Sequence, residues 1–242
     1  MRRMDIVFIF LGCALGCALN TVCGFGFGVV GMMFLPYVMG STVQAATVIN
    51  ACTFLQAAVL AVRYRRHIRW KLLWTPLAAY LVVSVAAVRL AVGLDNQLMK
   101  RIFGAFLLVL SGYFIFAAKR VRMRARVRNG LIAGTVGGVM SGMFATGGPP
   151  ASLYFSAVTE TKEEYLATIQ AYFTVTNFYV VAVRALNGAL TGAVARAVGV
   201  GLAGLLVGNF LGELVFRRVD VDFIRKAIYV MMALSGAAMV FL

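Results

Sequence analysis

The sequence predicts an all-α polytopic membrane protein: two homologous four-span repeats, each with a broken or re-entrant helix, and about eight transmembrane helices in total. Three observations predict this class. Hydrophobic residues make up 62% of the 242 residues and charged residues only 13%, unlike the balance of a soluble domain. Several apolar runs reach the roughly 20 residues that cross a bilayer. Stretches broken by glycine and proline occur at matching places in the two halves.

Each apolar run predicts one helix. Helices are expected in the first half at residues 5–23, 26–39, 42–62, 72–92 and 98–118, and in the second half at 130–145, 148–157, 165–183, 197–216 and 223–242. The chain therefore divides into a first membrane repeat (1–118), a basic cytoplasmic linker (119–129) and a second membrane repeat (130–242). If the short pieces are re-entrant, each half crosses four times, and this even count gives both halves the same orientation. Short pieces that cross fully are the alternative.

Short identities support the duplication. The matching segments are Ile49-Asn50-Ala51 with Ile169-Gln170-Ala171, Leu60-Ala-Val-Arg63 with Val181-Ala-Val-Arg184, and Ser111-Gly112 with Ser235-Gly236. The first apolar run follows Arg2-Arg3, as in a signal peptide, but its counterpart lies in mid-chain. We therefore interpret the first run as a retained span.

The net charge of +15 is concentrated in two short loops, residues 63–71 and 119–128. This is the positive-inside pattern, with anionic lipid headgroups as further partners, and it argues against nucleic-acid binding. It predicts a multi-pass protein of the cell (inner) membrane with both termini cytoplasmic, in contact with the lipid bilayer. The sequence leaves open whether the chain forms a homo-oligomer.

The two broken stretches are Gly24-Phe-Gly26-Phe-Gly28, followed by Pro36, and the segment Gly142-Met-Phe-Ala-Thr-Gly-Gly-Pro-Pro150. Broken helices expose backbone groups in the bilayer, which is tolerated only where protein or a water-filled cavity receives them. Paired breaks are therefore a good pointer to a transporter's binding site. Residues 26–31 also satisfy G-x-G-x-x-G, but they lack the βαβ context of a dinucleotide site. The spaced glycines elsewhere predict helix-packing faces: Gly12/Gly16, Gly134/Gly138 and Gly204/Gly208/Gly212.

A half-helix that begins inside the membrane points unpaired N–H groups and a positive dipole end into the protein, which suits a small oxyanion. The candidate substrate-binding residues are Thr21, Cys23, Gly24, Gly26, Gly28, Asn50, Thr146, Gly147, Gly148, Pro149, Gln170 and Asn177. Ser141 and Ser152 near the breaks are further hydroxyl helpers. A hydroxyl bonded back to its own helix is the alternative for each Ser or Thr. Interhelical packing is the alternative for Asn50 and Gln170.

Missing residue types narrow the function further. No Asp, Glu, Lys, Arg or His lies in the central part of a predicted span, so no proton-coupling residue is evident. The lone His67 lies among arginines and the four cysteines lack His or carboxylate company, which predicts no enzyme, no metal and no cofactor. Arg89 and Glu213 match across the halves and are a candidate gating pair. The alternative is that each reaches separately to the interface.

A Gly-rich segment leading to a proline, repeated once in an eight-span pattern, resembles the sulfite exporter TauE/SafE family. The first copy departs from the family's usual glycine run by alternating Gly with Phe, and the second places Pro149-Pro150 after the Gly pair. The resemblance implies a membrane permease that exports a small sulfur-containing anion, sulfite or an organosulfonate. Two other classes stay open: an ion-coupled importer of another small anionic solute, and a non-transporting membrane assembly protein.

Overall fold

The computed structural model describes residues 3–23, 26–116, 126–216 and 221–241, and every regular element in these ranges is helical. The helices are α1 (Arg3–Cys23), α2 (Phe27–Met39), α3 (Thr42–Arg63), the short 3-10 turn η1 (Arg65–His67), α4 (Trp70–Gly93), α5 (Asn96–Phe116), α6 (Val127–Phe144), α7 (Gly148–Val158), α8 (Lys162–Leu186), α9 (Gly192–Phe216) and α10 (Val221–Phe241). These bounds follow the predicted segments within a few residues. The all-helical class is confirmed.

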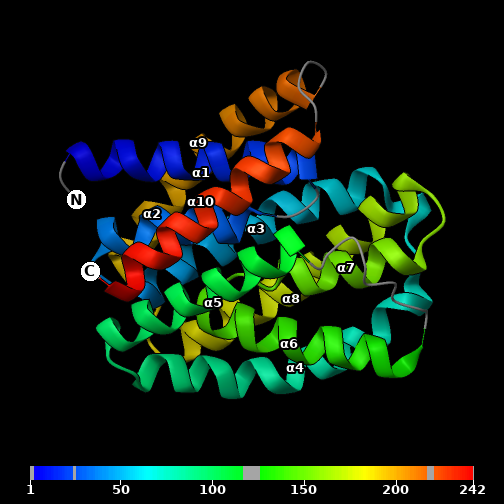
Figure 1. Ribbon diagram of the computed structural model, residues 1–242, viewed down its shortest axis with the longest axis horizontal. Coiled ribbons are helices and arrows are strands. Elements are labelled where there is room, and N and C mark those ends of the chain that lie inside the picture. The colour runs from blue at the N-terminus through cyan, green and yellow to red at the C-terminus, as the bar shows by residue number, and fades with distance from the viewer. Residues whose placement is uncertain (1–2, 24–25, 117–125, 217–220, 242) are drawn as a thin grey trace.

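Five described helices are long and apolar enough to cross a membrane: α1, α3, α4, α8 and α9. Large apolar side chains point outward from many helices, as a lipid-facing surface requires. Among the most exposed are Val59, Val82, Val109, Phe178, Leu206, Phe210 and Leu234. Figure 1 shows the long helices running roughly side by side between two ends of the molecule, with both termini at the same end.

The short helices return alongside the helices that precede them. Gly12 and Gly16 of α1 lie against Leu35 and Phe27 of α2, so α1 and α2 form an antiparallel hairpin. In the same way, Gly137 of α6 lies beside Gly147, at the start of α7. Each hairpin therefore brings the chain back toward the end from which it came (Figure 1).

The expectation that both halves have the same orientation is wrong. Corresponding long helices of the two halves are antiparallel. Thr47 of α3 meets Arg184 of α8, and further along the pair the Phe54 and Phe178 rings are 5.4 Å apart. The α5 and α10 helices also run in opposite directions, with Gly104 against Gly236. The expectation counted α1 as one full crossing and α2 as none. In the structure α1 runs out and α2 runs back beside it, so the pair adds no net crossing and each half has an odd number of crossings.

Two parallel helix pairs join the halves through glycine. Gly204, Gly208 and Gly212 of α9 lie directly against the backbone of α1. Gly134, Gly138 and Gly142 of α6 lie against the backbone of α4 in the same manner. The absence of side chains lets the helices approach closely enough for backbone contact. The predicted packing role of the spaced glycines is confirmed.

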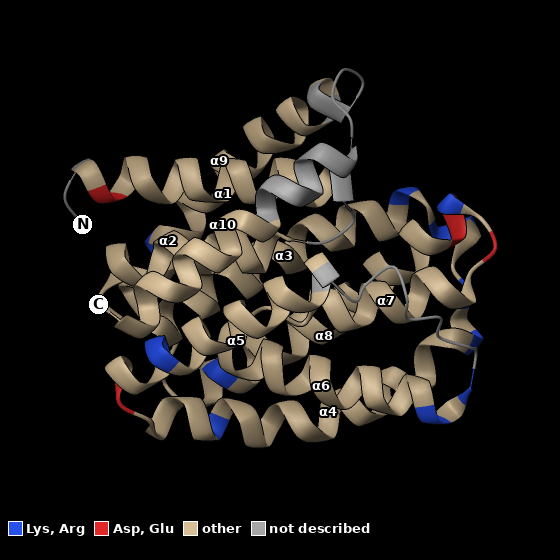
Figure 2. Ribbon diagram, in the orientation of Figure 1, with Lys and Arg blue, Asp and Glu red and all other residues tan. Residues whose placement is uncertain are grey.

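Charge is unevenly divided between the two ends. Figure 2 shows Lys and Arg gathered where α3 joins α4 and where α6 begins, at the end opposite both termini. The sequence predicted that both termini and the basic 63–71 loop lie on the same side of the membrane. This prediction is wrong, because the termini and the loop lie at opposite ends of the molecule. An ion pair between Arg69 and Glu164, with 3.3 Å between guanidinium nitrogen and carboxylate oxygen, ties that loop to the start of α8.

Candidate functional site

The two broken segments meet inside the protein. Gly28, in the first turn of α2, lies directly against the carbonyl of Ala145 and beside Thr146, where a side chain would collide with this backbone. Gly26 has φ of 120°, a conformation that only glycine adopts readily. Ala145 ends α6 in the left-handed region with φ of 56°, at a cost of about 1–2 kcal/mol for a residue with a Cβ. Special backbone geometry thus marks both breaks.

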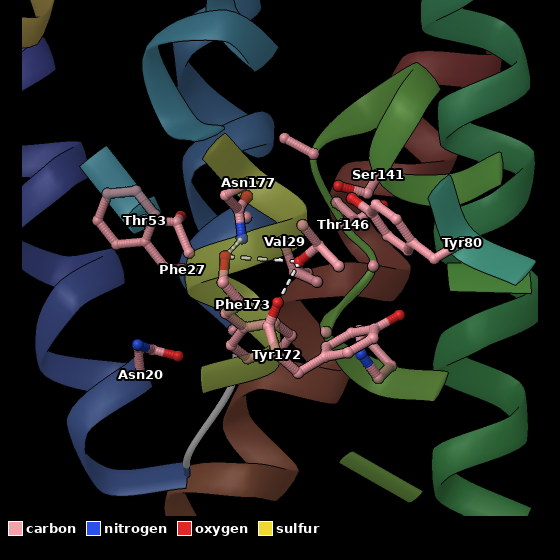
Figure 3. Close-up of a pocket in the computed structure, with 17 residues that line it drawn as sticks. Asn20, Phe27, Val29, Thr53, Tyr80, Ser141, Thr146, Tyr172, Phe173 and Asn177 are labelled. Atoms are coloured by element: carbon pink, nitrogen blue, oxygen red, sulfur yellow. Dashed lines mark hydrogen bonds between the residues drawn. The ribbon is translucent and has the colours of Figure 1, made fainter. Parts of the chain in front are cut away.

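A cavity of about 30 Å³ opens between these breaks (Figure 3), enough for at least one water molecule. In Figure 3, Tyr80 and Ser141 lie on one flank and Asn20 and Phe27 on the other. Five further helices, α1, α3, α4, α6 and α8, complete the wall around the α2 and α7 ends. The lining residues are Asn20, Gly26, Phe27, Gly28, Val29, Thr53, Tyr80, Ser141, Ala145, Thr146, Gly147, Gly148, Pro149, Tyr172, Phe173, Thr176 and Asn177. We call this space the central pocket.

Two helix N-termini face the central pocket. The first N–H groups of a helix have no intrahelical partner and carry the positive end of its dipole. In α2 these groups belong to Phe27, Gly28 and Val29, since the Val30 N–H already bonds the Gly26 carbonyl at 2.9 Å. In α7 the second and third residues are Pro149 and Pro150, which have no N–H. Most of the backbone donors at the pocket therefore come from α2.

Two tyrosine hydroxyls in the wall lack partners. Tyr80 of α4 and Tyr172 of α8 pack edge to face, with ring centroids 5.7 Å apart. Both hydroxyls are buried, and neither has a partner within hydrogen-bond distance among the described residues, although the Ser141 and Thr176 hydroxyls lie near that of Tyr80. Leaving a buried hydroxyl unsatisfied costs about 1–3 kcal/mol. Such groups are usually paired in native proteins, so two orphans in one pocket point to a missing acceptor, a ligand or water.

Other hydroxyls of the wall are already occupied. Thr53 donates to the Ile49 carbonyl and Thr176 to the Tyr172 carbonyl, each at 2.8 Å, so both bond back to their own helix. The Asn177 amide likewise donates to the Phe173 carbonyl at 2.8 Å.

Asn20 connects the pocket to a buried polar chain. Its side-chain amide donates to the Gln56 oxygen at 3.0 Å, and the Gln56 amide reaches the Cys17 sulfur at 3.0 Å. Cys13, Cys17 and Cys52 are free and buried. Among the residues that the structure describes, no group of His, Cys, Asp or Glu could hold a metal ion.

The structure gathers several of the predicted site residues around the central pocket: Gly26, Gly28, Thr146, Gly147, Gly148, Pro149 and Asn177. Thr21 is not among the lining residues, and its hydroxyl donates to the Cys17 carbonyl and to the Asn209 side-chain oxygen. Gly24 and the side chain of Cys23 lie outside the described residues.

Asn50 and Gln170 lie outside the pocket wall but are almost fully buried, at 0% and 1% exposure. Both atoms of each amide lack a partner among the described residues. Interhelical hydrogen bonding, the alternative expected for them, is therefore not seen. Arg89 is exposed on α4, and the Glu213 side chain lies outside the described residues, so their gating role stays a prediction.

Sequence reasoning missed Arg184. Its side chain is completely buried near the end of α8, whereas the predicted span stopped one residue earlier. The guanidinium donates to the carbonyls of Val43 at 2.9 Å and of Gly142 at 2.7 Å, with longer contacts to those of Ser141 and Met143. The match with Arg63 marked the position, but Arg63 itself is exposed.

Comparison of the sequence with known proteins identifies the family of this chain. The family model described as "Sulfite exporter TauE/SafE" matches residues 8–239. The chain belongs to this family. As a TauE/SafE member it is similar to the "Probable sulfite/organosulfonate exporter TauE" of Cupriavidus necator, with 25% identity over 204 residues, 82% of this chain and 79% of that protein. No solved structure matches the chain.

Proposed function

We propose that the protein exports a small sulfur oxyanion, sulfite or an organosulfonate, through the central pocket. One observation carries this proposal: the α2 and α7 N-termini and the two unpaired hydroxyls of Tyr80 and Tyr172 converge on one buried cavity. Every one of these groups can donate to an oxyanion, and helix N-termini are established anion sites. Among the residues that the structure describes, no Asp or Glu lines the pocket. The chemistry therefore fits the name of the Cupriavidus relative.

The arrangement of helices supports a transporter. We propose that the halves are inverted repeats, related by a pseudo-two-fold axis in the membrane plane, with residues 1–118 and 130–242 as the two units and residues 119–129 as their linker. The antiparallel pairs α3 with α8 and α5 with α10 fit such an axis. So does the equivalence of the parallel pairs α1 with α9 and α6 with α4. In transporters of this kind, substrate sites lie at the repeat interface, beside broken helices.

We propose further that the basic end is cytoplasmic, in the inner membrane, because Lys and Arg in short loops set orientation. In this proposal both termini face the opposite side, since they lie at the other end of the molecule (Figure 1). Movement of an anion out of a negative interior gains about 2.3 kcal/mol per charge per 100 mV. Export therefore needs no coupling ion.

An ion-coupled importer is the alternative, and one observation disfavours it. In such transporters the coupling cation binds unwound carbonyls and the C-terminal ends of half-helices. At the end of α6 those carbonyls, from Ser141 to Met143, already bind the Arg184 guanidinium. The family of exporters to which the chain belongs argues in the same direction.

The proposal is tested by efflux of radiolabelled sulfite from proteoliposomes with an imposed interior-negative potential. The key variant is Tyr80→Phe/Tyr172→Phe, which removes both unpaired hydroxyls and keeps the rings. Hydrogen bonds to a charged group contribute about 1.5–3 kcal/mol each, so efflux should fall at least roughly tenfold. Tyr179→Phe, also on α8 but away from the pocket, is the matched control and should keep the wild-type rate.

Two results would contradict the proposal. One is the absence of protein-dependent flux for sulfite and for a panel of organosulfonates. The other is wild-type efflux by the double tyrosine variant, which would place the anion elsewhere.

A further inference from the structure

Arg184 lies between the central pocket and a second cavity. The second cavity has a volume of about 240 Å³ and lies at the end of the molecule that holds both termini. Its wall comes from the α2–α3, α4–α5 and α8–α9 connections. The polar lining residues are Ser41, Gln44, Asn96, Asn187 and Thr191. No Asp or Glu is among the described residues of this wall, and its hydroxyls and amides suit a hydrated anion. We call this cavity the vestibule.

The contacts of Arg184 bridge the two cavities. Val43 lines the vestibule, and its carbonyl accepts from one guanidinium nitrogen at 2.9 Å. Ser141 lines the central pocket, and its carbonyl, 3.4 Å away, accepts from the other nitrogen together with Gly142. The guanidinium thus fills the space between the vestibule wall and the break that forms the pocket.

The positively charged guanidinium of Arg184 donates hydrogen bonds only to uncharged oxygens. Its acceptors are backbone carbonyls and the Thr47 hydroxyl at 3.3 Å. No carboxylate pairs with it among the described residues, and its Nε is buried without a partner. Carbonyls at the end of α6 carry the negative end of that helix dipole, which stabilises the cation in place of an acid. A full negative charge would bind the guanidinium more strongly than these partial charges do.

We propose that Arg184 is the gate between the central pocket and the vestibule, and the second binding station of the exported oxyanion. In the structure the gate is closed, with the guanidinium bound to the α6 carbonyls and to α3. An oxyanion that leaves the central pocket competes for the guanidinium, releases it from the carbonyls and opens the way to the vestibule. This inference rests on the proposed export function and assigns one step of it to a single side chain.

The experiment compares Arg184→Lys, Arg184→Gln and Arg63→Gln by two measurements. Sulfite efflux from proteoliposomes reports the whole path, and equilibrium binding of radiolabelled sulfite in detergent reports the central pocket. Arg63 is the matched control because it occupies the corresponding repeat position but is exposed. A thermal melt in detergent identifies any variant that fails to fold. If Arg184→Gln does not fold, Arg184→Lys, which keeps the positive charge, still tests the gate.

The gate requires charge, whereas a purely structural clamp requires only hydrogen bonds to carbonyls. We expect Arg184→Gln to lose at least tenfold in efflux while its sulfite affinity stays within about threefold of wild type. Arg184→Lys should recover most of the rate, and Arg63→Gln should match wild type. Equal efflux by the Gln and Lys variants would overturn the gate, as would loss of sulfite binding by a folded Arg184→Gln protein. If wild type itself moves no oxyanion, the proposed function fails instead.

Discussion

The two breaks differ in what they bring to the same pocket. The α1–α2 break supplies backbone: the N–H groups of Phe27, Gly28 and Val29 at the start of α2. The α6–α7 break has Pro149 and Pro150 at the equivalent place and loses two donors there. It is surrounded instead by side chains, with the Tyr80 and Tyr172 hydroxyls in the pocket and Arg184 on the preceding carbonyls. We call the wall that the α1–α2 break supplies the backbone half-site of the central pocket, and the wall around the α6–α7 break its side-chain half-site.

The largest effect is expected where the two half-sites touch. Gly28→Ala places a methyl group against the Ala145 carbonyl, so the breaks must separate. Overpacking of this kind against backbone costs roughly 3 kcal/mol. The thermal midpoint in detergent should fall, and sulfite binding should be lost.

Gly199→Ala is the control for that change, because a methyl group at this α9 position meets nothing within 4 Å. It should leave the midpoint unchanged or raise it, since alanine favours helix more than glycine does. A Gly28→Ala protein as stable as wild type would show that the breaks do not need their close contact.

A smaller effect is expected at the matching amides Asn50 and Gln170. Their replacement should raise the stability of the fold but lower the rate of transport. We propose that Asn50 and Gln170 contact the anion in passage, which explains why buried amides without partners are kept. Asn50→Leu and Gln170→Met remove unsatisfied groups, so each should stabilise the fold by about 1–2 kcal/mol. Each should also slow sulfite efflux. Faster unfolding with unchanged efflux would show that the amides serve the fold alone.

The smallest effect should come from restoring one backbone N–H donor in the side-chain half-site. Pro149→Ala restores an N–H in the first turn of α7, at the pocket wall. One further hydrogen bond is worth about 1 kcal/mol, which tightens sulfite binding roughly fivefold. Pro150→Ala restores an N–H outside the wall and should change affinity less. Identical affinities in both variants and wild type would remove α7 from the anion site.

Helix positions could be predicted closely because hydropathy is a local property of the chain. The breaks could also be predicted, since Gly and Pro mark them directly, and several of their residues line the pocket. The orientation of each half across the membrane could not be predicted. It depends on whether α2 continues away from α1 or folds back on it, and that choice is decided by contacts such as Gly16 with Phe27.

The most informative side chains of the site were missed for a related reason. Tyr80 and Tyr172 look like ordinary apolar residues of a span, and only the tertiary structure leaves their hydroxyls unpaired. Arg184 follows an apolar run, where hydropathy places a residue that reaches toward the headgroups. Its burial depends on carbonyls from Ser141 to Met143, about forty residues earlier in the chain.

The glycine contacts between α1 and α9 also have a consequence for biosynthesis. Helix α1 leaves the ribosome long before its closest backbone partner, which lies at Gly204 to Gly212. At about 5–20 residues per second, that partner emerges on the order of 10–40 s later. Until then, the face of α1 that will pack on glycine must be covered by lipid or by a membrane insertase. A nascent chain stalled after residue 116 should therefore hold α1 in a non-native environment, detectable by crosslinking from Cys13.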